Sequence, residues 1–173
     1  MPSRPVGRCR HVLEDHNRRL GEVSVGDDGG HPSARIFPTP STRQNGHMTE
    51  RRLISSGSPF EPRIGFSRAV VIGNRILVSG TAPIWPDGEV DPDPYAQTKR
   101  CLEIILAALS EAGATAEQVV RTRVFITEAT DFEEVGRALG ETFSRIRPAS
   151  TMVVVKGLLD SRWKVEIEAE AEI

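Results

Sequence analysis

The chain ends in Lys164-Val165-Glu166-Ile167-Glu168-Ala169-Glu170-Ala171-Glu172-Ile173, a run in which apolar and charged side chains alternate strictly. Successive residues of an extended strand face opposite sides, so this pattern predicts a strand with its apolar side on a core. The other side carries four carboxylates, each about 6.6–6.8 Å from the next. Because like charges this close repel one another, we expect at least one glutamate to have a specific partner or role.

Two segments upstream have clear local signals. Residues 67–72 and 75–79 are apolar and β-branched, and Gly73-Asn74 between them suits a tight turn, which predicts a β-hairpin. A helix is expected to begin at Asp93-Pro94 and to end at Gly113, since these residues fit its two caps. Its apolar stripe has helical spacing and consists of Leu102, Ile105, Leu106 and Leu109.

The segments that follow repeat this alternation of strand and helix. Residues 119–126 predict a strand with Val120, Thr122, Val124 and Ile126 on one side, and Arg123 and Phe125 on the other. The sequence 130–133 resembles a capping box that starts a second helix, with a buried side formed by Phe132, Val135, Leu139 and Phe143. Another strand is expected over 151–155.

The predicted order β-β-α-β-α-β-β indicates an α+β fold, a mixed β-sheet with two α-helices on one face. Its other face would carry Arg123, Phe125 and the glutamates, a mixture typical of neither a core nor a solvated surface. A sheet of this kind can cover its bare face by self-association. We therefore expect a homo-oligomer with binding sites at the subunit contacts.

Residues 1–47 differ from the rest of the chain. They hold all four histidines and show no sustained apolar period, so we interpret 1–47 as a disordered extension, or as sequence upstream of a true start at Met48, with one domain over 48–173. Acidic residues and the lack of an apolar segment argue against a targeting peptide. The histidine spacings fit no metal-ligand pattern with Cys9.

Composition excludes several classes of function. Residues 1–47 hold seven of the 22 basic and five of the 24 acidic residues, so residues 48–173 have a net charge of −4 and nucleic acid is not an expected partner. No apolar run approaches the ~20 residues of a membrane helix. The two cysteines are far apart in the chain and indicate no disulfide scaffold, so we expect a reducing, cytoplasmic compartment. No histidine follows His47, so we expect no histidine-ligated metal site in residues 48–173.

Six short segments of the chain resemble the RidA/YjgF family of reactive-intermediate deaminases, in the same order. They are 64–70, 78–83, Gln97-Thr98, 124–127, Pro148-Ala149-Ser150-Thr151 and 165–169. The resemblance spans about residues 59–173 and implies a chorismate-mutase-like fold, a homotrimer, and small-molecule clefts between subunits. It also implies hydrolysis of enamines and imines derived from amino acids, without a cofactor.

The resemblance assigns roles to individual positions. Glu166 matches the glutamate beside the reactive water, and Ser79 and Gly80 match residues that hold a polar ligand group. Phe66 replaces a tyrosine and so lacks its hydroxyl, whereas Ser150, followed by Thr151 at the cleft, replaces the arginine that binds a substrate carboxylate. Losing a charged partner in a desolvated cleft costs about 2–5 kcal/mol, so we expect poor activity on 2-imino acids.

Another arginine is an alternative partner for a carboxylate. Arg147 lies three positions before Ser150, an odd offset that would turn it to the opposite face of a strand unless a turn at Pro148 intervenes. Arg68 and Arg123 are further candidates from neighbouring segments.

Three interpretations of function therefore remain. The protein is a small-molecule binding module, a hydrolase of C–N bonds that uses Glu166, or, as a label sometimes given to this family suggests, an RNA-processing protein, which the acidic composition disfavours. Glu166 is alternatively one member of an arginine-paired, solvated strand face.

Overall fold

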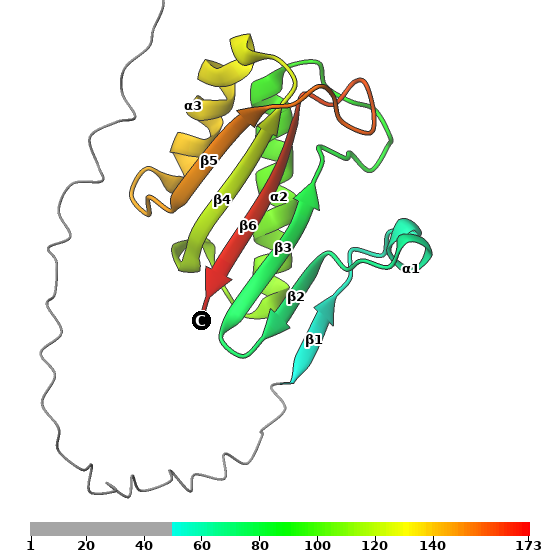
Figure 1. The fold of residues 1–173 in the computed structure, drawn as a ribbon, viewed down its shortest axis with the longest axis vertical. Helices are drawn as coiled ribbons and strands as arrows, with labels where there is room; N and C mark the ends of the chain where they lie inside the picture. Colours follow the sequence, from blue (N-terminus) through cyan, green and yellow to red (C-terminus); the bar gives the residue numbers. More distant parts are fainter. Residues whose placement is uncertain (1–49) are drawn as a thin grey trace, which may run out of the picture. The chain divides into compact units, whose positions relative to one another are not determined.

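Six strands form a single sheet in the computed structural model, which describes residues 50–173. In spatial order they are β1 (Arg51–Ile54), β2 (Ala69–Ile72), β3 (Arg75–Thr81), β6 (Val165–Glu172), β4 (Val119–Ile126) and β5 (Ala149–Val154) (Figure 1). Only β4 and β5 pair in parallel, so the sheet is mixed. The expected extension over 1–47 and the alternative start at Met48 lie outside the described residues.

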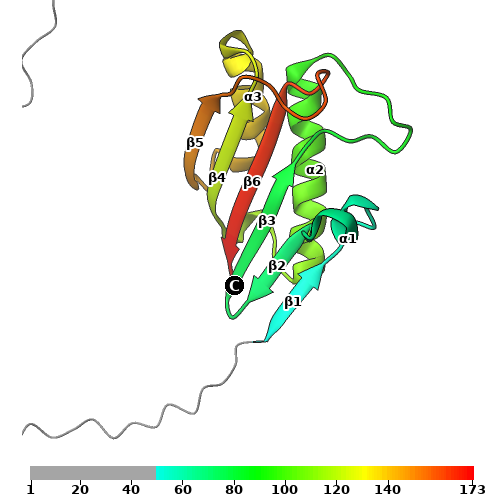
Figure 2. The ribbon, with the colours of Figure 1, turned by 45° about the vertical axis from the view of Figure 1, so that its right-hand side comes forward.

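Two long helices cover one face of the sheet. They are α2 (Pro94–Ala112) and α3 (Phe132–Phe143), and both lie behind the sheet in Figure 1 and on one side of it in Figure 2. The predicted α+β architecture is thus confirmed. Neither they nor the other described helices are long and apolar enough to cross a membrane.

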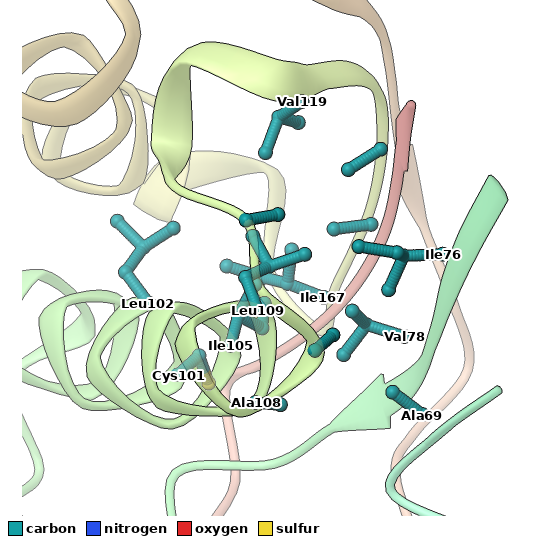
Figure 3. Close-up of a cluster of buried hydrophobic side chains, with 14 of the residues drawn as sticks. Ala69, Ile76, Val78, Cys101, Leu102, Ile105, Ala108, Leu109, Val119 and Ile167 are labelled. Atoms are coloured by element: carbon teal, nitrogen blue, oxygen red, sulfur yellow. The ribbon is translucent and has the colours of Figure 1, made fainter. Parts of the chain in front are cut away.

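Helix α2 has the predicted ends. The Asp93 side chain accepts hydrogen bonds from the backbone N–H groups of Tyr95 and Ala96, and Gly113 ends the helix at a φ of 91°, where a residue with a side chain would be strained. The helix packs its apolar side on the sheet, where Ile105 and Leu109 lie beside Ile167 (Figure 3). Leu102, Ile76 and Val78 belong to the same buried cluster.

The hairpin and the last strand also follow the sequence pattern. Gly73, with a φ of 59°, lies in the turn between β2 and β3. In β6 the apolar residues Val165, Ile167, Ala169 and Ala171 are buried against the helices, and the glutamates face the opposite, open side of the sheet. The strict alternation of this strand therefore places every carboxylate on one face.

The sequence analysis missed two elements at the edge of the sheet. Strand β1 extends the hairpin, and a short helix, α1 (Phe60–Ile64), follows it. Ile54 is buried, and Arg52 donates to the carbonyl groups of Glu111 and Ala112 at the end of α2, at 3.1 and 2.7 Å. These contacts anchor β1 to the end of α2 and to the buried core.

Three side-chain predictions were wrong. The pairing of β4 with β6 shifts between Val119 and Arg121, so Val119 is buried and Val120, predicted to face the core, is 44 % exposed. Helix α3 follows a 3-10 turn (Ala129–Asp131) and shows no side-chain cap, contrary to the expected capping box. Phe132, at its first turn, is exposed rather than buried, whereas Val135 and Phe143 enter the core.

Candidate functional site

Arginines pair with two of the four glutamates on the open face. Arg123 binds the carboxylates of Glu168 and Glu170 at 3.0 and 3.1 Å, and Arg75 binds Glu170 at 2.9 Å from the neighbouring strand. These contacts explain how closely spaced carboxylates are tolerated. For Glu168 and Glu170, the interpretation as an arginine-paired strand face is therefore correct.

Glu166 differs from Glu168 and Glu170, which are paired with arginine, and from Glu172, which is exposed. The Glu166 carboxylate makes no hydrogen bond or ion pair within residues 50–173, and it is half-buried. Burial and, to a smaller extent, the charge of Glu168 raise its pKa above the ordinary value, and the positive charge of Arg68 opposes this shift. A carboxylate in this environment is more basic than an exposed one and is free to bind a ligand or a water molecule.

Gly80 provides the surface on which Glu166 lies. The register between β3 and β6 shifts between Val78 and Thr81, which indicates an irregularity in β3 at residues 79–80. A Cβ atom at position 80 would collide with the Oε1 atom of Glu166. The two positions matched by the resemblance are thus direct neighbours, and only glycine leaves room for the carboxylate.

Ser79 and Arg68 complete this end of the sheet. The Ser79 hydroxyl donates to the carbonyl oxygen of Ser67 at 2.7 Å, which leaves its own oxygen able to accept. Arg68 donates through Nη1 to the Thr81 hydroxyl at 2.5 Å, and at longer range to the carbonyl oxygens of Gly80 and Ser79. One arginine therefore fixes the backbone on which Glu166 lies.

Sequence reasoning missed Glu61, a buried acid in α1. It accepts hydrogen bonds from both hydroxyl groups of Ser55 and Ser56 at 2.6 Å, and from the Ser56 backbone N–H at 2.8 Å. Burial acts to raise its pKa, but these hydrogen bonds and the charge of Arg68 lower it overall. The serine pair just before the acid was its only signal in the sequence.

The structure turns Ser150 and Thr151 to opposite faces of the sheet. The buried Thr122 hydroxyl donates to the Ser150 hydroxyl at 3.0 Å, so Ser150 lies on the helix side. Thr151 is exposed and pairs in register with Arg123 on the open face. Within one chain, Ser150 therefore lies on the face opposite to Glu166.

Arg147 is not part of a strand, so the expected opposite orientation of its side chain does not apply. It adopts a φ of 54° after α3, and β5 begins only at Ala149, after Pro148. Arg147 and Ser150 line the same hollow, of about 200 Å³, which is otherwise formed by Thr122, Leu139, Gly140, Phe143, Ser144 and Pro148. The left-handed backbone at Arg147, just before Pro148, thus brings these two predicted residues together.

The predicted site residues accordingly form two groups. Glu166, Ser79 and Gly80 gather at one end of the sheet, near Arg68, and Arg147 and Ser150 gather beside α3. Phe66 is half-buried at the end of α1, where its backbone N–H donates to the Glu61 carbonyl oxygen at 3.1 Å. Within residues 50–173, no three side chains of histidine, cysteine, aspartate or glutamate come together as a metal site requires.

Comparison with known proteins identifies a matching family and similar solved structures. The family described as "Endoribonuclease L-PSP" matches residues 57–173. A solved structure from Mycobacterium tuberculosis, described as a member of the YjgF/YER057c/UK114 family, is 42 % identical, with a TM-score of 0.66 over 72 % of this chain and 100 % of that one.

Curated relatives agree with the structural match. An uncharacterised protein of Streptomyces coelicolor is 44 % identical over 123 residues, which is 69 % of this chain and 90 % of that protein. The 2-iminobutanoate/2-iminopropanoate deaminase of Escherichia coli is 34 % identical over 110 residues, 61 % of this chain and 85 % of the deaminase. The chain therefore belongs to the RidA/YjgF family.

Proposed function

We propose that the protein hydrolyses imines or enamines that lack a carboxylate group, in clefts completed by a second subunit of a homotrimer. The observation that carries this proposal is the Glu166 carboxylate, which is half-buried, lies against Gly80 and makes no ion pair within the described residues. The related deaminase of Escherichia coli supports the reaction type.

Glu166 would act as the acid–base group. The substrate reacts as its protonated imine. Glu166 takes a proton from a water molecule as the water oxygen adds to the carbon of the protonated imine, which gives a neutral carbinolamine. Glu166 returns this proton to the nitrogen and then takes the hydroxyl proton as the C–N bond breaks, so that ammonia and a carbonyl compound leave and Glu166 releases the last proton to solvent. An enamine first accepts a proton at carbon, which gives the same protonated imine. Burial favours these steps because it raises the pKa of Glu166 and so strengthens it as a base.

The charges around the site favour a neutral or cationic substrate. Two carboxylates, Glu61 and Glu166, lie near a single guanidinium, that of Arg68, which already donates to the Thr81 hydroxyl. Ser150 offers no positive charge, and its hydroxyl is bonded to Thr122. A substrate carboxylate would thus meet excess negative charge without a bidentate partner at position 150, and Arg147, which lines the hollow of Ser150, has its Nε on the Ser144 carbonyl oxygen at 3.3 Å.

The open face of the sheet supports self-association. It exposes apolar side chains, among them Leu53, Ile72, Leu77 and Val153, beside the arginine–glutamate ladder. Because Ser150 and Glu166 lie on opposite faces of one subunit, a cleft that contains both needs residues from two subunits. A homotrimer with three such clefts fits this requirement.

The reaction is tested by ammonia release from imines generated in situ. We expect hydrolysis of imines without a carboxylate at a higher kcat/KM than that of 2-iminopropionate, and loss of about 100-fold or more in Glu166→Gln. Glu168→Gln is the matched control, because Glu168 is already paired with Arg123. Equal rates for the Glu166 variant and the unchanged protein would overturn the proposed hydrolase.

Two other functions would appear as different outcomes. Retention of small molecules without any ammonia release would indicate a binding module. Tight RNA binding in a mobility-shift assay at moderate salt would favour the RNA-processing alternative. The arginines of the open face support the opposite expectation, because Arg75, Arg121 and Arg123 all pair with glutamates rather than forming a free basic patch.

A further inference from the structure

Arg68 is a half-buried cation at the end of the sheet that holds Glu166. Its backbone carbonyl accepts from the Ser79 N–H at 3.0 Å, which continues the pairing of β2 with β3. Its side chain then reaches along residues 79–81 and donates to the Thr81 hydroxyl, which itself donates to the Ser79 carbonyl oxygen at 2.8 Å. The guanidinium is therefore fixed against the segment that contains Gly80.

Hydrogen bonds satisfy this guanidinium only in part. Its Nε atom is buried and has no acceptor within residues 50–173. A buried cation is costly unless anions compensate it. Two anions act on Arg68 by their charge: Glu61, which precedes it in the chain, and Glu166, which lies in the last strand.

We propose that Arg68 is a positioning residue for Glu166: it holds the backbone at Gly80, on which the Glu166 carboxylate lies, and supplies a permanent positive charge at this end of the sheet. The inference rests on the proposed role of Glu166 as the acid–base group. An arginine suits this task because it stays charged at any working pH and its fork can hold several oxygens at once. Arg68 thus supplies a positive charge at the site, which the neutral Ser150 cannot supply.

The elements around Glu166 carry few other charged groups that act on it. Glu168 lies two residues along β6 and is paired with Arg123 of β4, and Phe125 of β4 pairs in register with Glu166 and carries no charge. On the helix side, the buried thiol of Cys101 in α2 has its pKa raised by burial and by Glu166, so it stays neutral at working pH. Glu61 of α1 competes with Glu166 for Arg68. Arg68 is therefore the cation that acts most directly on Glu166.

The charge is tested by NMR titration of the Glu166 carboxyl carbon in the full chain, with the signal assigned from Glu166→Gln. In Arg68→Gln, which removes the charge but keeps an N–H donor, we expect the Glu166 midpoint to rise by about one pH unit. Arg68→Lys should restore a midpoint near that of the unchanged protein. The acid limb of the kcat/KM profile should move with the midpoint.

Arg75→Met is the matched control. It removes an equal charge from the same sheet, but Arg75 pairs with Glu170, four residues or about 13 Å along β6 from Glu166. We expect it to leave the Glu166 midpoint unchanged. Equal shifts in the Arg75 and Arg68 variants would show a general charge effect and overturn the inference, as would an unchanged midpoint in Arg68→Gln.

A measurement on the unchanged protein keeps the test decisive if Arg68→Gln does not fold. The guanidinium signals of Arg68 should shift with the same midpoint as Glu166, and this shift should vanish in Glu166→Gln. Arg68 guanidinium signals that do not shift as Glu166 titrates would overturn the inference. Linked titration without any ammonia release would instead retain the Arg68–Glu166 coupling and overturn the proposed hydrolase, so the two failures are distinguishable.

Discussion

The Glu166 carboxylate occupies the space that a side chain at Gly80 would need. Gly80 comes from an irregular part of β3, and Glu166 lies near the start of β6, so the contact joins two strands that are far apart in the sequence. Because the obstructing atom is the far end of a flexible side chain, an added methyl group would move the carboxylate rather than the backbone. Position 80 therefore controls where the proposed acid–base group lies.

Gly80→Ala should separate stability from activity. We expect a loss of only about 1 kcal/mol in the free energy of unfolding, since the Glu166 side chain can swing away. Ammonia release should nevertheless fall to the level of Glu166→Gln, because the carboxylate no longer lies in place. Urea unfolding and initial rates measure the two effects. Adding Glu166→Ala to Gly80→Ala should recover the lost stability, and strict additivity would argue against the contact.

The sequence predicted those elements whose signals are local. The alternation in β6, the Asp93-Pro94 cap of α2 and the Gly73-Asn74 turn each depend on neighbours within a few residues, and each was found where expected. Strand β1 was missed because four residues carry too little pattern, and its order comes from distant contacts such as Arg52 with the end of α2.

Parts of the site depended on long-range geometry. The register shift that exposes Val120 has no distinct sequence signal, and Pro148 alone could not decide whether the backbone before it brings Arg147 beside Ser150. The resemblance placed Glu166, Ser79 and Gly80 in one site, and the structure brings Glu166 and Gly80 into contact. Arg68, a minor alternative in the sequence, is the arginine whose charge acts on Glu166, because the segment at residues 79–81 holds it there.

Gln97 should be a stabilising residue for the loops that precede β6. It is fully buried, donates to the carbonyl oxygens of Asp91 and Arg162 at 2.7 and 3.0 Å, and accepts from the Lys164 N–H at 2.7 Å. Gln97→Leu leaves these backbone groups unpaired, so we expect a loss of at least about 2 kcal/mol in urea unfolding. Thr98→Val, which removes one local bond to Pro94, should cost less. A similar cost for both would contradict the bridging role.

Glu166 should make stability fall as pH rises. The pKa of Glu166 in the folded state is above the ordinary value, so the folded chain holds the proton more tightly than the unfolded chain does. The protonated carboxyl therefore adds to the free energy of unfolding at low pH, and this added stability is lost as pH rises through the folded pKa. Relative to Glu166→Gln, the unchanged protein should thus lose stability from about pH 4.5 upward, as measured by urea unfolding across a pH series.

Glu141 provides a control of opposite sign. Hydrogen bonds from Lys99 and Tyr95 lower the pKa of Glu141. Its contribution to stability is therefore present above the ordinary pKa of a glutamate and is lost as pH falls through the lowered pKa. Parallel pH profiles for Glu166→Gln and Glu141→Gln would show that the predicted environment of Glu166 is wrong.

Leu77→Arg should disrupt the proposed homotrimer. Leu77 projects from β3 on the open face, 36 % exposed, and a buried, unpaired guanidinium there would oppose association. Sedimentation should give three copies for the unchanged protein at micromolar concentration and single copies for the variant. Leu159→Arg, at a loop residue that is 94 % exposed, should remain trimeric. A monomeric unchanged protein would overturn the proposed assembly, and a trimeric Leu77 variant would remove β3 from the contact.

Ser150→Arg should extend activity to imines that carry a carboxylate. The new guanidinium offers two parallel charge-assisted hydrogen bonds where serine offers one neutral hydroxyl, and about 2 kcal/mol of added binding in the transition state corresponds to a gain of about 30-fold in kcat/KM for 2-iminopropionate. The Thr122 hydroxyl loses its partner, so a stability loss of about 1 kcal/mol should accompany the gain. Ser150→Lys, a charge without the fork, should gain less. A folded, trimeric Ser150→Arg variant with no gain would mean that position 150 does not line the cleft of Glu166.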